Sequence, residues 1–502
     1  MKILPFFLII FVLALFLSAC GGSGRSENSN NTLSRWQPSI FEPASNFAQK
    51  CVVPTTWINP YNNLQFTDTQ GTVVDENNWL RSWSNASYLW YDEIIDKDPA
   101  LYTDPVAYFS LLKTEASTIS GKPKDQFHFS VSLAEYETYL TAVSARYGFY
   151  FRVLHHSPTT EVVILYTEPN SPAAQAGLQR GTKIMAVDGN AFDVTDLVPD
   201  GVDETHTFLV LDSGSVTPRT VVLSSAVITN TPVRHVSVFD TTAGQIGYLL
   251  FTFHAGKAEE ELINAIRYFA DEGIRDLVLD LRYNSGGLID IANRLSYMLA
   301  GFDQPEQPIF YSQQFNNKSP ELTSHVFSSL SSAGETLPTL NLARVFILTG
   351  ASTCSASELI INGLRGIDVD VIQVGETTCG KPYGFIDQIN CGRVYSSINF
   401  KSLNNNNFGD YADGFSPENS IETAGIRLAG CYVADNDYEH MLGDPQEALF
   451  AAALQYRIDG SCPTISPSSV SKKSATPEQD LLIDSKQNHP FWRNNMRPFI
   501  SR

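Results

Sequence analysis

The sequence predicts a multi-domain α/β protein, and two observations indicate this fold class. Apolar strands alternate with helices between residues 277 and 374, a pattern typical of a parallel sheet with helical crossovers. The chain has 502 residues, 43% of them hydrophobic, which is enough for about three domains with large buried cores. No second long apolar run follows the one at the N-terminus, so we expect no further membrane span.

Residues 1–19 have the features of an export signal. Met1-Lys2 precedes an apolar run over 3–16, and Leu17-Ser18-Ala19-Cys20 follows. The small residues before Cys20 resemble a bacterial lipobox, which implies cleavage before Cys20 and lipidation of its thiol. That reading places the chain on a membrane of the bacterial cell envelope, with the outer membrane favoured because Gly21 follows, facing the periplasm or the surface. A short membrane anchor and an ordinary secretory signal are the alternatives.

Two segments follow the signal. Residues 20–45 are rich in Gly, Ser and Asn and poor in apolar residues, which predicts a flexible tether. Residues 46–126 contain four of the six tryptophans. Aromatic residues at roughly helical spacing form a core more often than a cofactor site, so we expect a small helical domain there.

Residues 127–228 carry the signals of a β-rich module. Ser171 caps a short helix that Pro172 opens, Gly177 ends it, and Asp188-Gly189 makes a hairpin turn. The stretch 168–189 is similar to PDZ domains. By that resemblance the backbone around Tyr147, Gly148, Phe149 and Tyr150 would hold the carboxylate of a peptide that adds as a strand. The alternative is a purely structural module.

Residues 229–465 are expected to form the main α/β domain. One buried strand over 277–282 leads to Gly286-Gly287 and a helix over 288–299, and two further strands cover 345–349 and 370–374. Functional loops of a parallel sheet collect outside the carboxyl ends of its strands. Gly286, Gly287, Ser355 and Lys381 each lie just past such an end, so they are expected to share one edge.

Ser355 stands at the mouth of a helix. A hydroxyl in that position lies beside free backbone N–H groups, where developing negative charge is favoured, and this predicts a serine hydrolase. Taken alone, Ser355-x-x-Glu358 is also a well-formed capping box. The convergence of the other loops at the same edge favours the nucleophile.

Three ordered motifs carry a resemblance to the carboxy-terminal processing (tail-specific) serine peptidases. They are Asp280-Leu-Arg-Tyr-Asn-Ser-Gly-Gly287, Thr353-Cys-Ser-Ala-Ser-Glu358 and Gly375-Glu-Thr-Thr-Cys-Gly-Lys381. The resemblance implies a crotonase/ClpP-like α/β domain that cleaves protein substrates near their carboxyl termini through an acyl-enzyme. It implies Ser355 as nucleophile, Lys381 as general base, and the N–H groups of Ala356 and of Gly286 or Gly287 as the oxyanion hole.

Lys381 accepts a proton from serine only if burial depresses its pKa, and residues 379–385 bring no other charge nearby. The alternative is an ordinary surface lysine in a Gly/Pro turn. The family usually has a glutamine four residues after the lysine, where this chain has Phe385. Gln388, or Asp387 beside it, is a candidate substitute as orienting group, or the orienting role is absent.

Seven cysteines include Cys20; the other six allow three disulfides in an exported protein, by any of fifteen connectivities. Cys379 and Cys391 form the closest pair outside the serine motif, and a bridge between them would brace the loop of Lys381. No spacing suits a zinc site, and we expect no cofactor. Cys354 is disfavoured as a nucleophile because it lacks the capping position. The net charge of -20 argues against nucleic-acid binding.

A closing helix is expected over 443–454, and residues 466–502 have the composition of a tail. The sequence as a whole predicts an exported, lipid-anchored serine endopeptidase with a PDZ-like module for the tails of peptide or protein substrates. Two alternatives stay open. One is a catalytically decayed relative that binds peptides or lipids, and the other is a serine hydrolase with His254 as base; His440 is a weaker candidate.

Overall fold

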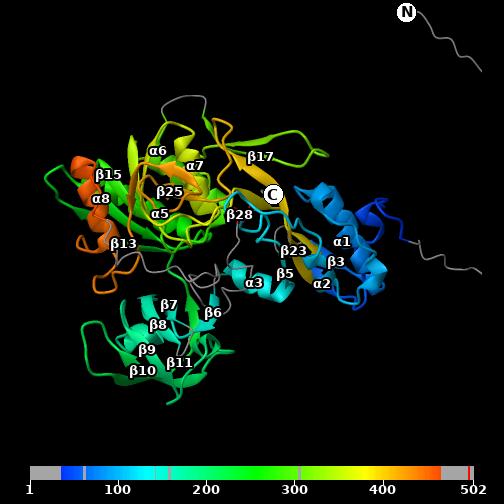
Figure 1. Cartoon of the computed structure of the whole chain (residues 1–502), viewed down its shortest axis with the longest axis horizontal. Coiled ribbons are helices and arrows are strands. Elements are labelled where there is room, and N and C mark those ends of the chain that lie inside the picture. The colour runs from blue at the N-terminus through cyan, green and yellow to red at the C-terminus, as the bar shows by residue number, and fades with distance from the viewer. Residues whose placement is uncertain are drawn as a thin grey trace, which may run out of the picture.

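The computed structural model describes residues 36–59, 64–141, 143–155, 160–302, 307–464 and 496–497. The expected signal, Cys20, most of the tether and nearly all of the tail lie outside these residues. Three bodies are visible in Figure 1: an N-terminal region around α1 and α2, a five-stranded module around β7 to β11, and a larger body of sheets and helices. None of the helices in the described part is both long and apolar enough to cross a membrane.

A six-stranded sheet organises the largest body. Its order is β13 (Val233–Phe239), β14 (Ile246–Phe251), β15 (Asp276–Asp280), β19 (Arg344–Thr349), β20 (Asp370–Gly375) and β27 (Gly430–Tyr432). β13 and β14 pair antiparallel, and all later pairs are parallel. The parallel sheet predicted from alternating strands and helices is therefore confirmed.

Helices cover both faces of this sheet. α5 (Ala258–Glu272), α6 (Ile289–Ala300) and α7 (Ala356–Arg365) pack on one face, and α8 (Ala448–Asp459) packs on the other. Successive strand residues point to opposite faces: Leu277 and Leu279 join the core under α5 to α7, and Val278 joins the core under α8. Because both faces are covered, the strands read as continuous apolar runs, which is why the sequence revealed them.

Smaller sheets extend this body. A four-stranded sheet contains β18 (Thr323–Val326), β17 (Ile309–Gln314), β24 (Ile398–Leu403) and β21 (Tyr383–Phe385), and a three-stranded sheet contains β22 (Gln388–Asn390), β23 (Arg393–Ser396) and β5 (Phe129–Ser132). Two-stranded parallel pairs join β25 (Phe415–Pro417) to β26 (Ile426–Leu428), and β16 (Gly287–Leu288) to β28 (Met496–Arg497). The last pair brings a piece of the chain's own tail beside the Gly286-Gly287 loop.

The N-terminal region is less purely helical than expected. It contains α1 (Val73–Ser87), α2 (Pro105–Ser110), three 3-10 turns (Ala44–Asn46, Tyr91–Glu93, Pro99–Leu101), and the short strands β1 (Lys50–Cys51), β2 (Thr56–Ile58), β3 (Gln65–Thr67) and β4 (Thr69–Gln70). Trp79 and Trp83 stack with ring centroids 5.4 Å apart, and Trp79 also contacts Tyr395 of β23. The tryptophans therefore form a core that attaches this region to the larger body.

The five-stranded module has the order β11 (Arg219–Ser224), β10 (Thr205–Leu211), β9 (Lys183–Val187), β8 (Glu161–Thr167) and β7 (Phe149–His155). It also contains α4 (Pro172–Gln175), a 3-10 turn (Val194–Leu197), and a separate pair of β6 (Val143–Arg146) with β12 (Ala226–Thr229). The predicted local signals are present. Ser171 Oγ accepts from Ala174 N–H at 3.2 Å, Gly177 has φ +71°, and both Asp188 and Gly189 have positive φ.

The stretch between the N-terminal region and this module belongs to the larger body in space. β5 pairs with β23 of that body, and α3 (Leu133–Thr141) follows it directly. The module therefore begins at β6, later than the predicted boundary at residue 127. The position of this boundary depends on the pairing of two strands that lie more than 250 residues apart in the sequence. No local sequence signal near residue 127 indicates that pairing.

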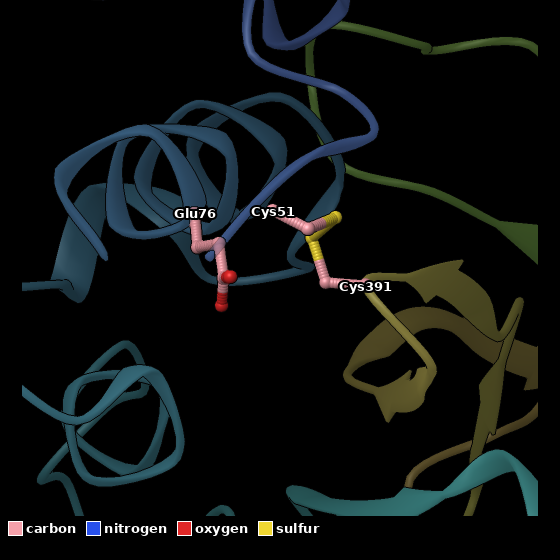
Figure 2. A group of neighbouring side chains, drawn as sticks. All are labelled: Cys51, Glu76 and Cys391. Carbon is pink, nitrogen blue, oxygen red and sulfur yellow. A yellow bond between two sulfur atoms is a disulfide. The ribbon is translucent and has the colours of Figure 1, made fainter. Parts of the chain in front are cut away.

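Three disulfides join Cys51 to Cys391, Cys354 to Cys379 and Cys431 to Cys462. The suggested bridge between Cys379 and Cys391 is therefore wrong, because each of these cysteines has a partner that sequence spacing did not single out. Figure 2 shows Cys51 on the N-terminal region bonded to Cys391, with Glu76 of α1 nearby. Sulfur atoms bonded to each other are not thiolates, so this group is not a set of free metal ligands.

Removing the Cys51–Cys391 bridge with Cys51→Ser and Cys391→Ser is expected to destabilise the attachment of the N-terminal region by about 2–4 kcal/mol. The bond closes a loop of 340 residues, so its loss frees a large amount of chain entropy in the unfolded state. Thermal unfolding measures the effect. The matched control is the pair Cys431→Ser and Cys462→Ser, which opens a loop of only 31 residues; a smaller shift of Tm for Cys51/Cys391 than for this control would contradict the expectation.

Candidate active site

Ser355 lies between β19 and α7 in a strained backbone conformation. Its φ of +61° and ψ of -117° fall where non-glycine residues are rarely found. Such strain persists only where the surroundings enforce it, and it clusters at functional sites. The side chain is fully buried, and its Oγ has no hydrogen-bond partner within the described ranges. The hydroxyl is thus held in place by the backbone and left available for chemistry.

Glu358 holds the serine and the lysine loops together. One carboxylate oxygen, Oε2, accepts from the backbone N–H of Ser355 at 3.0 Å and of Lys381 at 2.8 Å. The other, Oε1, accepts from Gly380 N–H at 2.8 Å and from Thr378 Oγ1 at 2.5 Å. Burial raises the pKa of this carboxyl, and these donors act in the opposite direction. The capping position that the sequence showed therefore also connects two motifs.

Lys381 is fully buried, unlike an ordinary surface lysine. Its Nζ lies 4.0 Å from the ring centroid of Phe385 and 5.2 Å from that of Phe127. Phe385 stands at the position where the family usually has glutamine, so an aromatic face replaces an amide beside the lysine. Aromatic faces attract an ammonium group, whereas burial disfavours its charged form; the two effects oppose each other here.

The glycine loop lies directly against the serine. A Cβ atom on Gly286, which has φ +104°, would come within 2.8 Å of Ser355 Cβ and 3.0 Å of Ala356 N, so only glycine fits this approach. The N–H of Gly286 donates to Asn284 Oδ1 at 2.9 Å. Ala356 is the first residue of α7, where backbone N–H groups have no acceptor within the helix. The structure thus brings Gly286, Ala356 and Ser355 together, as the motifs predicted.

His254 supports the glycine loop from the other side. Its backbone N–H donates to Gly286 O at 3.1 Å, its backbone oxygen accepts from Leu288 N–H at 2.9 Å, and its Nδ1 lies 3.0 Å from Asn284 Oδ1. Burial lowers the pKa of His254 to about 4, so the ring is neutral at neutral pH. His440 lies elsewhere, with Nδ1 2.9 Å from Asp437 Oδ2, which raises its pKa.

Gln388 and Asp387 are the two residues that the sequence offered as groups to orient Lys381. Gln388 begins β22 and is paired with Tyr395, and the neighbouring Asp387 carboxylate accepts from Tyr136 Oη at 3.0 Å and Ser396 Oγ at 2.6 Å. The orienting role of Gln388 stays a prediction.

The predicted carboxylate loop precedes an edge strand. Tyr147 is buried, Gly148 has φ +91°, and the oxygen of Gly148 accepts from Glu168 N–H at 2.7 Å. Phe149 and Tyr150 open β7, which lies at the edge of the five-stranded sheet. An edge strand presents unpaired backbone groups to a further strand.

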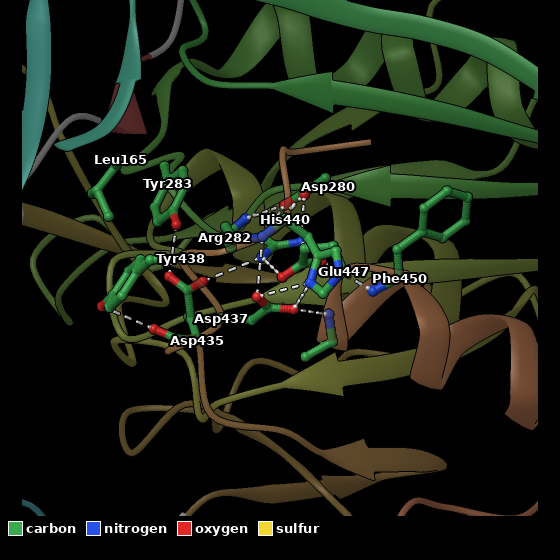
Figure 3. A network of polar contacts seen from close by, with 12 residues as sticks. Leu165, Asp280, Arg282, Tyr283, Asp435, Asp437, Tyr438, His440, Glu447 and Phe450 are labelled. Atoms are coloured by element: carbon green, nitrogen blue, oxygen red, sulfur yellow. Dashed lines mark hydrogen bonds and ion pairs between the residues drawn. The ribbon is translucent and has the colours of Figure 1, made fainter. Parts of the chain in front are cut away.

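A buried ionic network, which sequence reasoning missed, connects the module to the first motif (Figure 3). Asp435 contacts Arg180 of the module at 3.0 Å and Arg282 of the motif at 3.2 Å through Oδ1. Its Oδ2 contacts Arg152 of β7 at 2.9 Å and accepts from Tyr283 Oη at 2.7 Å. Burial alone would raise the pKa of Asp435, but the three guanidinium groups hold it well below its usual range. Arg282 also binds Glu447, at the start of α8, with both terminal nitrogens.

Comparison with known proteins gives a family match over the part of the chain that contains Ser355 and Lys381. Residues 245–386 match the model of Peptidase family S41. The chain is 28% identical over 232 residues to a carboxyl-terminal-processing protease of Synechocystis sp., a match that covers 44% of this chain and 50% of that protein. It is 26% identical over 220 residues to carboxyl-terminal-processing peptidase 1, chloroplastic, of Arabidopsis thaliana, with 42% of each protein covered. The match thus spans about half the length of these curated relatives.

One solved structure shares most of the fold. A putative S41 protease from Bacteroides fragilis superimposes with a TM-score of 0.62 and 24% identity, over 76% of this chain and 97% of that one. The shared architecture includes more than the matched segment 245–386. The resemblance predicted from three motifs is confirmed by the family match and the curated relatives.

Proposed function

Because residues 245–386 match the model of Peptidase family S41, we propose that the protein is a serine endopeptidase that cleaves protein substrates near their carboxyl termini. The names of the curated relatives, carboxyl-terminal-processing protease and peptidase, favour this substrate class. The observation that carries the proposal is Glu358, whose Oε2 accepts from the backbone N–H groups of both Ser355 and Lys381. This contact joins the nucleophile and the base in one rigid unit.

In the proposed reaction, Ser355 Oγ attacks the scissile carbonyl while Lys381 Nζ takes its proton. The N–H groups of Ala356 and Gly287 stabilise the oxyanion, because the N–H of Gly286 is already bound to Asn284. Lys381 then protonates the departing amine, which leaves an acyl-enzyme on Ser355. A water molecule that loses its proton to Lys381 hydrolyses the ester and frees Ser355.

The substrate is proposed to bind as an added strand at two places. In the module, β7 offers an edge beside the loop of Tyr147 and Gly148, as PDZ domains do for peptide carboxyl termini. At the active site, β16 begins at Gly287 of the glycine loop and pairs in parallel with β28, which also lies against β21 just after Lys381. An extended substrate that lies between the glycine loop and the loop of Lys381 passes both the oxyanion donors and the base.

Ending the chain at residue 489 removes β28 and is expected to raise kcat/KM for a peptide substrate severalfold. In the full chain the tail strand on β16 competes with substrate for the same edge. Steady-state kinetics measures the change. The matched control replaces residues 490–502 by a Gly/Ser segment of equal length, and its kcat/KM should rise as in the truncated protein. An unchanged or lower kcat/KM in both variants would show that the tail does not compete with substrate.

A serine-reactive fluorophosphonate followed by peptide mass spectrometry tests the proposed function. We expect the probe on Ser355, no labelling in Ser355→Ala, and strongly reduced labelling in Lys381→Met. A folded wild-type protein that does not react would instead favour the decayed, peptide-binding relative.

The role of the carboxylate loop is tested by comparing cleavage of a peptide with cleavage of its carboxy-amidated form. Equal cleavage of both would count against capture of a free carboxylate by this loop.

The pH profile of kcat/KM is expected to separate the two candidate bases. Since burial holds the pKa of His254 near 4, a histidine base would be deprotonated, and activity already maximal, by about pH 6. A lysine base instead requires loss of an ammonium proton, so activity should still rise above pH 6, with an apparent pKa below the ~10.4 of free lysine. A rising limb near pH 4 that disappears in His254→Asn would identify the histidine as the base.

We further propose that the protein is exported and lipid-anchored in the bacterial cell envelope through Cys20, with the outer membrane as destination. The lipobox-like stretch before Cys20 supports this. Metabolic labelling with a fatty-acid analogue should mark the wild type and leave Cys20→Ala unmarked, because only the thiol accepts the lipid. Equal labelling of both proteins would exclude this anchor.

A further inference from the structure

The disulfide between Cys354 and Cys379 lies within the proposed catalytic unit. Cys354 directly precedes Ser355, and Cys379 stands two residues before Lys381. Each sulfur lies within 4.8 Å of a carboxylate oxygen of Glu358. This bond therefore joins the serine loop to the lysine loop covalently, at the same place where Glu358 joins them by hydrogen bonds.

Backbone contacts around the bridge show how tightly the two loops are fitted. Cys379 N–H donates to Thr353 O at 3.0 Å, and Cys354 N–H donates to Asn284 O at 3.2 Å. The loop that contains Cys354 thus contacts both the lysine loop and the first motif. Ser355 keeps its left-handed φ of +61° within this frame, and a strained residue depends on such surroundings to keep its geometry.

We propose that the Cys354–Cys379 disulfide is a positioning element of the Ser355–Lys381 pair, so that peptidase activity requires the oxidised bridge. The inference rests on the proposed function. It makes the enzyme active in an oxidising compartment and inactive while both cysteines are thiols. Neither of the other two bridges contains a residue of the three motifs: one joins Cys51 of β1 to Cys391, and the other joins Cys431 of β27 to Cys462 after α8.

Reduction by a dithiol has a defined point of attack. Cys379 is partly exposed whereas Cys354 is buried, so the thiolate of the reductant attacks Sγ of Cys379 and Cys354 leaves as a thiolate that takes up a proton. The second thiol of the reductant then displaces Cys379 as a thiol, and the reductant becomes a disulfide. Two electrons pass from the reductant to the bridge.

Two consequences of reduction disturb the dyad. Sulfur atoms that are no longer bonded cannot remain at covalent distance, so the two loops lose the covalent constraint that fixes their spacing. The Sγ of Cys379, which lies 3.3 Å from Glu358 Oε2 in the oxidised protein, also becomes a thiol donor beside the oxygen that accepts from Ser355 and Lys381. Because a displacement of about 1 Å at a reacting group costs about 10²-fold in rate, we expect kcat to fall at least tenfold.

The test compares Cys354→Ala/Cys379→Ala with the matched control Cys431→Ala/Cys462→Ala, which loses a bridge of similar span, 31 against 25 residues. For the first pair we expect kcat at least tenfold lower with KM nearly unchanged. The control should keep its kcat. Equal kcat in the wild type and the Cys354/Cys379 variant, or equal losses in both variants, would overturn the inference.

A redox titration of the wild type keeps the inference testable if the first variant does not fold. Activity is followed in dithiothreitol buffers of graded potential, and differential alkylation with mass spectrometry reports each bridge. Peptidase activity should fall as the reduced fraction of the Cys354–Cys379 disulfide rises, and it should return on reoxidation. The inference is contradicted if activity instead follows the reduced fraction of another disulfide, or of none of them. A wild type that neither cleaves peptides nor reacts with the fluorophosphonate would refute the proposed function itself.

Discussion

Ser355→Ala and Lys381→Ala are each expected to lower kcat by about 10⁴-fold or more, and the double variant should be little worse than either single one. Residues that act as one unit in the same step are not additive, because removing either partner already disables the step. Lys381→Arg should fail as well, since a guanidinium group stays protonated and cannot accept the serine proton. Peptide cleavage and circular dichroism, measured on all four variants, separate loss of chemistry from loss of fold.

Ser397→Ala is the matched control for the serine variant. Like Ser355, Ser397 is fully buried with an Oγ that has no hydrogen-bond partner in the described residues, but it precedes β24 and belongs to none of the three motifs. Its activity should remain close to that of the wild type. Retained activity in Lys381→Ala together with loss in His254→Asn would replace the lysine by the histidine as base.

Asp435→Ala is expected to lower the free energy of unfolding by about 3–5 kcal/mol, because it leaves buried guanidinium groups without their carboxylate. Arg180 is fully buried and Arg152 is largely so, and both lose the carboxylate they contact, whereas Arg282 keeps Asp280 and Glu447. Activity should fall too, since Arg282 and Tyr283 directly precede Asn284, which holds the glycine loop. Urea unfolding followed by fluorescence measures the stability change, with separate transitions allowed for the module and the larger body.

The control is Glu161→Ala, which removes an ion pair with Lys183 on the same module. Both side chains of that pair are substantially exposed, at 36% and 45%, and such pairs contribute about 0–1 kcal/mol. If Asp435→Ala lowers the free energy of unfolding no more than this control does, the buried network does not stabilise the contact between the module and the sheet.

Local patterns predicted the elements that surround the site. The strands at 276–280, 344–349 and 370–375 and the helices that begin at Ile289 and Ala356 were expected from apolar runs and capping residues. Hydrophobic periodicity, helix-capping residues and turn glycines each depend only on the conformation of the neighbouring backbone, so these signals extend over a few residues. The placement of Gly286 and Ser355 at one sheet edge followed from the same patterns with the rule for parallel sheets.

The sequence by itself thus determined the α/β class, the three motifs and their meeting at one edge, since each depends on local periodicity and chain order. Only the tertiary structure decided the partners of six cysteines, the aromatic face of Phe385 beside Lys381, and the carboxylate of Asp435 among three arginines. These contacts join residues as far as 340 positions apart. They form because packing brings distant side chains within bonding distance, and the spacing of residues along one chain contains no measure of that distance.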